Sequence, residues 1–223
     1  CLVGSEMCIR DRNNTEKDLL RQIAGISGFQ PGSAFNLRAN GAGVERHSTA
    51  NVQIRQKTDK PGIEIIVAPH TKGEQVHIPV IITDSGVTDL VYNDFYIGEG
   101  ADVDIVAGCG IHNDGCETSQ HDGIHTFHIG KHANVRYSEK HYGEGNGEGG
   151  RILNPTTNIY MEEGSCAQMD MSQIKGVDST KRVTYAQLGD GAKLIINEKL
   201  MTHGTQFAHS DVNVDLDLSL IHI

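Results

Sequence analysis

The chain has 223 residues, which is enough for one ordinary domain with a sizeable core. It contains 29 acidic and 19 basic residues, and its formal net charge of −10 argues against nucleic acid or an anionic membrane as the main partner. No apolar run approaches the ~20 residues that a membrane span needs.

The two ends of the chain differ in character from the rest. The stretches CLVGSEMCIRDR and LSLIHI resemble translated sequencing-adapter read-through, so residues 1–12 and 218–223 are left out of the fold prediction. We expect the native part to run from Asn13 to about Asp217 and to be cut short at its C-terminal end. It keeps three cysteines: Cys109, Cys116 and Cys166. An odd, sparse set without a regular framework is typical of a reducing compartment and predicts a cytoplasmic protein.

The first predicted element is a short helix from Thr15 to Ile26, within an N-terminal helical segment of residues 13–43. Thr15 followed by Asp18 gives a start that resembles a capping box. The apolar residues share one face of this helix: Leu19, Leu20, Ile23 and Ile26. Gly25 and the glycine and proline residues after it end the helix. We expect the helix to pack on a neighbouring core.

From residue 44 to residue 217 the pattern changes to short alternating segments. Residues 52–54 form one such segment, residues 63–67 form a continuous apolar run, and apolar residues alternate over 76–82. Turn residues separate the segments, as in the Asp-Lys-Pro-Gly sequence of residues 59–62. This part of the chain is therefore predicted to be all-β.

An internal repeat specifies the kind of β structure. The segments Ile97–Ile105, Ile129–Tyr137 and Leu188–Ile196 align with one another, and Met161–Met169 is a weaker copy. Each copy has an apolar residue, a tight turn, a small residue and then an alternating strand. The small residues stand at 101, 133, 165 and 192, so the spacings are 32, 32 and 27 residues.

A period of this size is typical of a stacked architecture in which each unit buries its apolar side against the next. The alternation has period two, which excludes repeats built from helix pairs. Propeller blades have longer repeats of about 40 residues. The sequence thus predicts an all-β fold, a β-helix or related β-solenoid over residues 44–217 with a short N-terminal helix.

Residue types that bind metals are concentrated in residues 109–150. Cys109 and Cys116 open this stretch, and Glu139 and Glu144 flank its last histidine. Six of the twelve histidines lie in it: His112, His121, His125, His128, His132 and His141. Imidazole, thiolate and carboxylate groups are the usual protein ligands of transition metals.

Local spacing alone specifies no metal site. Cys109 and Cys116 are seven residues apart, unlike the C-x-x-C pair of a zinc or redox motif. Ligands would have to come from stacked rungs, which a solenoid permits. The alternative is that the histidines are solvated in loops or form hydrogen-bonded ladders. Glu139 and His141 share one face of a strand, where they would hold a metal, relay a proton or form an exposed charge pair.

The glycine-rich segment 145–150 satisfies G-x-G-x-x-G, but it is not predicted to cradle a phosphate. Glu144 and Glu148 would repel a pyrophosphate, and Pro155 follows too soon for the helix that does the binding. We expect a loop between rungs. Cys166 is expected to point away from the interior and to take no part in chemistry.

Several long phrases resemble the SufB/SufD family, in particular its short form. They include TDKPGIEIIV, DLVYNDFYIGEGADVDIVAGCGIHNDG and HDGIHTFHIGKHANVRYSEKHYGEG, and the resemblance extends over about residues 14–217. It implies a right-handed parallel β-helix. It also implies a SUF-system scaffold for iron–sulfur cluster assembly and not a turnover enzyme, so this chain would have no catalytic residues.

The resemblance also implies partners. The scaffold would act with a SufC-type ABC ATPase and with a second β-helix subunit, either a SufB/SufD-type paralogue or a second copy of itself. A cysteine desulfurase system would supply sulfur. The cofactor would be a transient iron–sulfur cluster, with no nucleotide bound by this chain.

The principal cluster ligands of the family do not map onto this chain. They are a cysteine and a His-Glu pair near the C-terminal end of the β-helix, and the chain ends before reaching them. Local chemistry makes Cys109, Glu139 and His141 the first candidates for cluster or metal ligands. Weaker candidates complete the set: His112, Cys116, His121, His125 and His128. A metal-dependent enzyme with a His-rich site on a β-solenoid, and a purely structural solenoid, are the alternative functions.

Overall fold

The computed structural model describes residues 12–25 and 32–216. The two segments expected to derive from adapter sequence, residues 1–12 and 218–223, lie outside this part except for Arg12. The Arg12 side chain forms an ion pair with Glu16, with its Nη1 atom 2.8 Å from Oε1.

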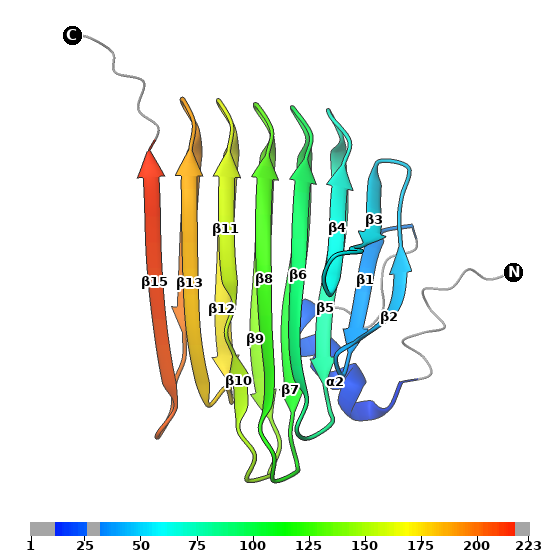
Figure 1. Cartoon of the computed structure of the whole chain (residues 1–223), viewed down its shortest axis with the longest axis vertical. Helices are drawn as coiled ribbons and strands as arrows, with labels where there is room; N and C mark the ends of the chain where they lie inside the picture. Colours follow the sequence, from blue (N-terminus) through cyan, green and yellow to red (C-terminus); the bar gives the residue numbers. More distant parts are fainter. Residues whose placement is uncertain (1–11, 26–31, 217–223) are drawn as a thin grey trace, which may run out of the picture.

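The chain winds into a β-solenoid of about five turns, with two sheets facing each other (Figure 1). Sheet A contains β1 (Ala34–Ala39), β2 (Ala42–His47), β5 (Lys72–Ile82), β7 (Asp102–His112), β9 (Asn134–Glu144), β12 (Cys166–Lys175) and β14 (Lys193–Leu200). Sheet B contains β3 (Val52–Gln56), β4 (Gly62–Val67), β6 (Thr88–Ile97), β8 (Ser119–Ile129), β10 (Arg151–Leu153), β11 (Thr156–Met161), β13 (Ser179–Leu188) and β15 (Phe207–Leu216).

All pairings are parallel except β1 with β2 and β3 with β4, which are antiparallel. Strands that are neighbours in a sheet are one turn apart in the sequence, as with β6, β8 and β11. The predicted β-helix with one short helix is therefore confirmed.

The internal repeat forms the corners where the chain passes from sheet B to sheet A. In the first copy, the Ala101 amide donates to the Gly98 carbonyl at 3.1 Å, and Gly100, the second of the two residues between them, has a φ of 64°. The other three copies make the same turn. A side chain larger than Ala101 would meet the next rung, since this alanine is fully buried.

The structure contains a fifth corner of this kind that the sequence comparison did not detect. The Thr71 amide donates to the Ala68 carbonyl at 3.4 Å, and His70 adopts a φ of 58°. Threonine and histidine stand here where most other copies have a smaller residue and glycine, so the sequence pattern was obscured.

Helix α2 (Asn14–Ala24) covers the outer face of sheet A (Figure 1). Its start differs from the predicted one. The capping box is formed by Asn13 and Glu16, where the Glu16 amide donates to Asn13 Oδ1 at 2.9 Å, and not by Thr15 and Asp18. Gly25 caps the C-terminus as predicted, whereas Ile26 lies outside the described residues. Within the described part, no helix is long and apolar enough to cross a membrane.

The β structure begins earlier than the predicted boundary at residue 44. Strand β1 lies inside the segment 13–43 and pairs in parallel with β5. Apolar side chains of β1 hold the strand in this place, because Phe35 and Leu37 pack in one buried cluster with Leu19 and Ile23 of the helix. The segment 13–43 is thus a helix followed by the first strand of sheet A.

The space between the sheets has an apolar half and a polar half. Near the corners it is filled by apolar side chains, among them Phe95 and Phe127, whose ring centroids are 4.3 Å apart. Farther from the corners, inward positions of the same strands carry polar side chains such as His125 and Glu139, and a smaller apolar cluster that includes Ile82 and Ile111 lies toward the far ends of the strands. The candidate site lies in this polar half.

Candidate functional site

A small cavity of about 20 Å³ lies between the two sheets in the polar half. Sheet A contributes Cys109, Glu139 and His141 to its wall, and sheet B contributes His121 and His125. A buried water needs about 10–15 Å³ of such space. The cavity therefore has room for one water molecule or one metal ion, and it is too small for an assembled cluster.

The register of sheet A brings together the three first candidate ligands. Cys109 of β7 lies directly beside His141 of β9, and Ala107 lies beside Glu139. Strand alternation turns all three candidates inward, and each is at most 3% exposed. The interpretation of Glu139 and His141 as an exposed charge pair is therefore wrong.

Glu139 is held by a closed set of contacts. Arg182 Nη1 donates to Glu139 Oε2 at 2.6 Å, and the Tyr137 hydroxyl donates to Oε1 at 3.0 Å. Burial by itself would raise the pKa of Glu139, but the positive charge of Arg182 and the contact with His141 hold it well below the ordinary value. The carboxylate is ionised, and both of its oxygens have partners.

His141 is held in the same set of contacts. Arg182 Nη2 lies 3.4 Å from His141 Nδ1, and a guanidinium can only donate, so Nδ1 accepts. Nε2 then carries the proton and faces Glu139 Oε1 at 3.6 Å. Burial lowers the pKa of His141, so the ring is neutral. Neither nitrogen of His141 has a lone pair directed at the cavity.

On the other side of the cavity, Asp89 of β6 orients His121 of β8. His121 Nδ1 lies 3.1 Å from Asp89 Oδ2, and Arg38 Nη2 donates to Asp89 Oδ1 at 2.6 Å. Burial would raise the pKa of Asp89, but the hydrogen bonds from His121 and Arg38 lower it strongly. An ionised carboxylate only accepts, so Nδ1 of His121 donates this hydrogen bond.

Cys109 and His125 are the neutral groups of the cavity wall. Burial, followed by the nearby charges of Asp89 and Glu139, raises the pKa of the Cys109 thiol well above its ordinary value. Burial lowers the pKa of His125 to about 4. His125 Nδ1 is buried and has no hydrogen-bond partner within the described structure.

Two weaker candidates lie at the end of β7, away from the cavity. The two ring nitrogens of His112 contact Asp114 Oδ2 at 2.8 Å and Glu144 Oε1 at 3.2 Å. Burial would lower the pKa of His112, but these two carboxylates raise it. Cys116 is exposed in the loop that follows. Neither residue joins the interior site.

The third weaker candidate outside the cavity, His128, lies on the outer face of sheet B. Its ring stacks between Tyr96 and Tyr160, with centroid distances of 4.9 and 5.4 Å. An open groove of about 470 Å³ runs beside these rings. His128 is therefore part of an outer aromatic ladder.

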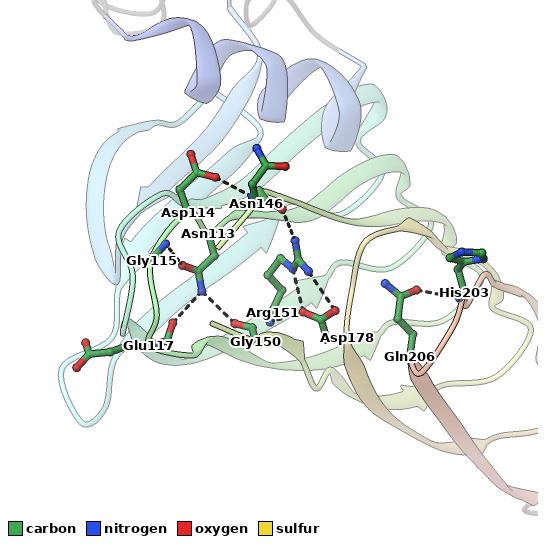
Figure 2. A network of polar contacts seen from close by, with 11 residues as sticks. Asn113, Asp114, Gly115, Glu117, Asn146, Gly150, Arg151, Asp178, His203 and Gln206 are labelled. Atoms are coloured by element: carbon green, nitrogen blue, oxygen red, sulfur yellow. Dashed lines mark hydrogen bonds and ion pairs between the residues drawn. The ribbon is translucent and has the colours of Figure 1, made fainter. Parts of the chain in front are cut away.

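The glycine-rich segment 145–150 stacks on the neighbouring loop 113–118 (Figure 2). Asn113 Nδ2 donates to the carbonyls of Glu117 at 2.8 Å and Gly150 at 3.2 Å. A Cβ atom at Gly147 would lie 2.3 Å from the Gly115 carbonyl oxygen. The glycines thus permit close stacking of two loops, in agreement with the predicted loop between rungs.

Sequence reasoning missed three charged residues of the site: Arg38, Asp89 and Arg182. The signal for two of them was present in the strand alternation. Leu188 and Ile97 face inward at the start of their repeat copies, and counting back in twos along β13 and β6 reaches Arg182 and Asp89. Charged residues at inward positions indicate a buried ion pair.

The side chains of the site do not form a ready-made metal centre. Within residues 12–25 and 32–216, no three histidine, cysteine or carboxylate side chains stand close enough together to hold a metal ion.

A scan of the chain against models of protein families found no match, and a search of curated proteins found none either.

Proposed function

We propose that this chain is a scaffold subunit for iron–sulfur cluster assembly that acts in the cytoplasm with a SufC-type ATPase. The observation that carries the proposal is the interior cavity, which stacked rungs of the two facing sheets line with a cysteine, three histidines and a glutamate. The resemblance of the long sequence phrases to the SufB/SufD family supports the same function. The ATPase, the second β-helix subunit and the desulfurase as sulfur source rest on that resemblance alone.

The chemistry of the cavity suits iron. Thiolate is the preferred ligand of iron–sulfur centres, and histidine replaces it in some of them. The Cys109 thiol is protonated in this structure because its pKa is raised, so binding of iron would have to displace that proton. The cavity of about 20 Å³ accommodates a single ion, and a complete cluster would need additional space.

Anaerobic reconstitution with ferrous iron and sulfide tests the proposal. We expect broad visible absorption with the unchanged protein and its loss in Cys109→Ala. Cys116→Ala is the matched control, because that thiol is exposed and lies outside the cavity. Equal absorption in Cys109→Ala and the unchanged protein would remove the interior site from cluster assembly.

The alternative functions have less support. A metal-dependent enzyme needs space for a substrate beside the metal, whereas the titratable residues of this cavity are at most 6% exposed. A purely structural solenoid leaves the neutral Cys109 and the unpartnered His125 nitrogen without a role. Uptake of neither iron nor any other metal in the reconstitution would favour the structural function.

A further inference from the structure

Gly123 leaves a notch in the cavity wall between two imidazole rings. A Cβ atom at this position would lie 2.9 Å from His125 Nε2 and 3.2 Å from His121 Nε2. The two nitrogens therefore face the same small space from positions on either side of Gly123 along β8. Any side chain here would fill that space, and glycine keeps it open.

His121 is prepared to act as a metal ligand. Its Nδ1–H group donates a hydrogen bond to the ionised Asp89, so Nε2, which faces the notch, is the nitrogen available to a metal. A histidine that binds a metal through one nitrogen commonly donates its other N–H to a carboxylate in this way. Arg38 holds the Asp89 carboxylate with two hydrogen bonds, at 2.6 and 3.2 Å, so the orientation of the ring is fixed from behind.

His125 has capacity for a ligand that the described part of the protein does not supply. Its buried Nδ1 atom has no hydrogen-bond partner there, and its Nε2 atom faces the notch. The side chain is 6% exposed. Buried polar atoms are normally paired. The Gly123 Cβ position is 3.4 Å from His125 Cδ2, and a half-turn of the ring would put Nδ1 there, so either nitrogen of this ring can reach the notch.

Cys109 lines the same cavity from the opposite sheet. Glu139 and His141, which also line it, are occupied by Arg182 and by each other. The donors that remain for a ligand are thus one sulfur and two imidazole nitrogens. Sulfur and imidazole together are typical ligands of zinc and ferrous iron, and hard cations such as magnesium and calcium prefer oxygen.

We propose that Cys109, His121 and His125 bind one divalent transition-metal ion, ferrous iron or zinc, with Asp89 as the positioning residue. In this structure the three side chains stand too far apart to hold an ion together, so binding requires Cys109 and His125 to rotate to bonding distances of about 2.0–2.3 Å, while Asp89 keeps His121 in place. The Cys109 proton is released to solvent as the metal–sulfur bond forms. The ion would keep one of its own water ligands in the fourth position, in space that the rotating side chains vacate. This site goes beyond the proposed function, because it requires no sulfide, no ATPase and no second subunit.

Cobalt(II) without sulfide is the probe for this site, because its spectrum reports both geometry and sulfur ligation. The ion is added anaerobically to the folded protein and also during refolding, since the cavity is enclosed. We expect one bound equivalent, a tetrahedral visible spectrum and a sulfur-to-cobalt charge-transfer band. Cys109→Ala should lose the charge-transfer band, and His125→Gln should weaken binding at least about tenfold.

Gly123→Ala is the most specific variant, because it keeps every ligand and fills only the notch. We expect it to weaken cobalt binding at least as much as His125→Gln does. His128→Gln is the matched control, since that histidine lies on the same strand but on the outer face. Circular dichroism and thermal unfolding show whether each variant is folded. If Gly123→Ala does not fold, His125→Gln and Cys109→Ala decide the question.

The proposal is overturned if cobalt binds without the charge-transfer band, or if Glu139→Gln abolishes binding while His125→Gln leaves it unchanged. Absence of binding under both loading conditions would also overturn it. Cobalt binding without a sulfide-dependent cluster would contradict the scaffold function and keep the metal site. Formation of a cluster by a protein that binds no cobalt in the absence of sulfide would contradict the metal site and keep the scaffold function.

Discussion

The interior of the solenoid has two halves that lie on the same strands and are filled by different chemistry. In the apolar half, one ladder of inward side chains runs across sheet B: Phe95, Phe127 and Ile159. Two residues earlier along the same strands, the next inward ladder is polar: Asn93, His125 and Thr157. Alternation decides which positions face inward, and it leaves their chemistry open.

The difference between the halves shows how a polar interior is tolerated. The apolar half stabilises the fold by burying hydrocarbon surface, which needs no matching partner. The buried charges of the polar half are tolerated because they form ion pairs, Glu139 with Arg182 and Asp89 with Arg38. A few atoms in this half have no hydrogen-bond partner within the part of the chain that the structure describes, including His125 Nδ1 and Thr157 Oγ1. We expect substitutions in the two halves to have different costs and different dependence on pH.

Removal of Arg182 is expected to have the largest effect. Arg182→Ala leaves the ionised Glu139 buried without its main partner, and breaking such a pair from one side costs about 3–5 kcal/mol of unfolding free energy. Urea unfolding measures the loss. Arg136→Ala is the control, because its pair with Asp104 is on the exposed outer face and contributes about 0–1 kcal/mol. A loss below about 1.5 kcal/mol in Arg182→Ala would mean that solvent reaches Glu139.

The second-largest effect is expected from acid, which should lower the unfolding free energy through the buried His125. The pKa of His125 is lowered from 6.5 to about 4 on folding, so below pH 6.5 the unfolded chain binds a proton that the folded protein excludes. Stability is therefore fully present above pH 6.5 and falls as the pH drops toward 4. The loss is up to about 3 kcal/mol, since one pKa unit corresponds to about 1.4 kcal/mol.

Denaturant unfolding at pH 7 and pH 5 measures this dependence. His125→Gln should reduce it, whereas His128→Gln on the outer face should leave it unchanged. His141 and His77 should supply the remainder, because burial lowers their pKa values as well. Asp89 and Glu139 have lowered pKa values, so their contribution is present above their unfolded values near 4 and is lost only at lower pH. Equal stability at pH 7 and pH 5 would show that His125 is protonated without cost.

A substitution in the apolar half should behave differently. Ile159→Val removes one methylene group from a fully buried side chain and should cost about 0.5–1.5 kcal/mol. Its cost should be the same at pH 7 and pH 5, because its ladder neighbours Phe127 and Ala186 carry no titratable group. Thermal unfolding at both pH values tests this. A pH-dependent cost would mean that the two halves are coupled.

The sequence predicted the fold better than the site, for a physical reason. The repeat around Ala101 and Ala133 is set by local sterics of a tight corner, so each copy carries its own signal. The site is formed by register between strands, which places Cys109 beside His141 although they are 32 residues apart in the sequence. That register was accessible only by counting from the corners.

The contacts that decide which ligands are available could not be predicted from the sequence. Cys109, His121 and His125 were candidates because of their chemistry, and the structure places them on one cavity. Glu139 and His141 were ranked above the two histidines, and the structure shows them held by Arg182. Such contacts depend on side chains from both sheets at one level of the solenoid, and no local pattern records them.

The smallest expected effect comes from Thr157, and it shows whether water enters the polar half. Its buried hydroxyl has no partner among the described residues, so Thr157→Val should be neutral or stabilise the protein by up to about 1 kcal/mol. Thr180→Val is the matched control, because its hydroxyl donates to the Leu153 carbonyl and its loss should cost about 1 kcal/mol. Urea unfolding of both variants measures the difference. If Thr157→Val costs as much as Thr180→Val, an internal water already pairs with this hydroxyl, and the polar half is hydrated beyond the cavity.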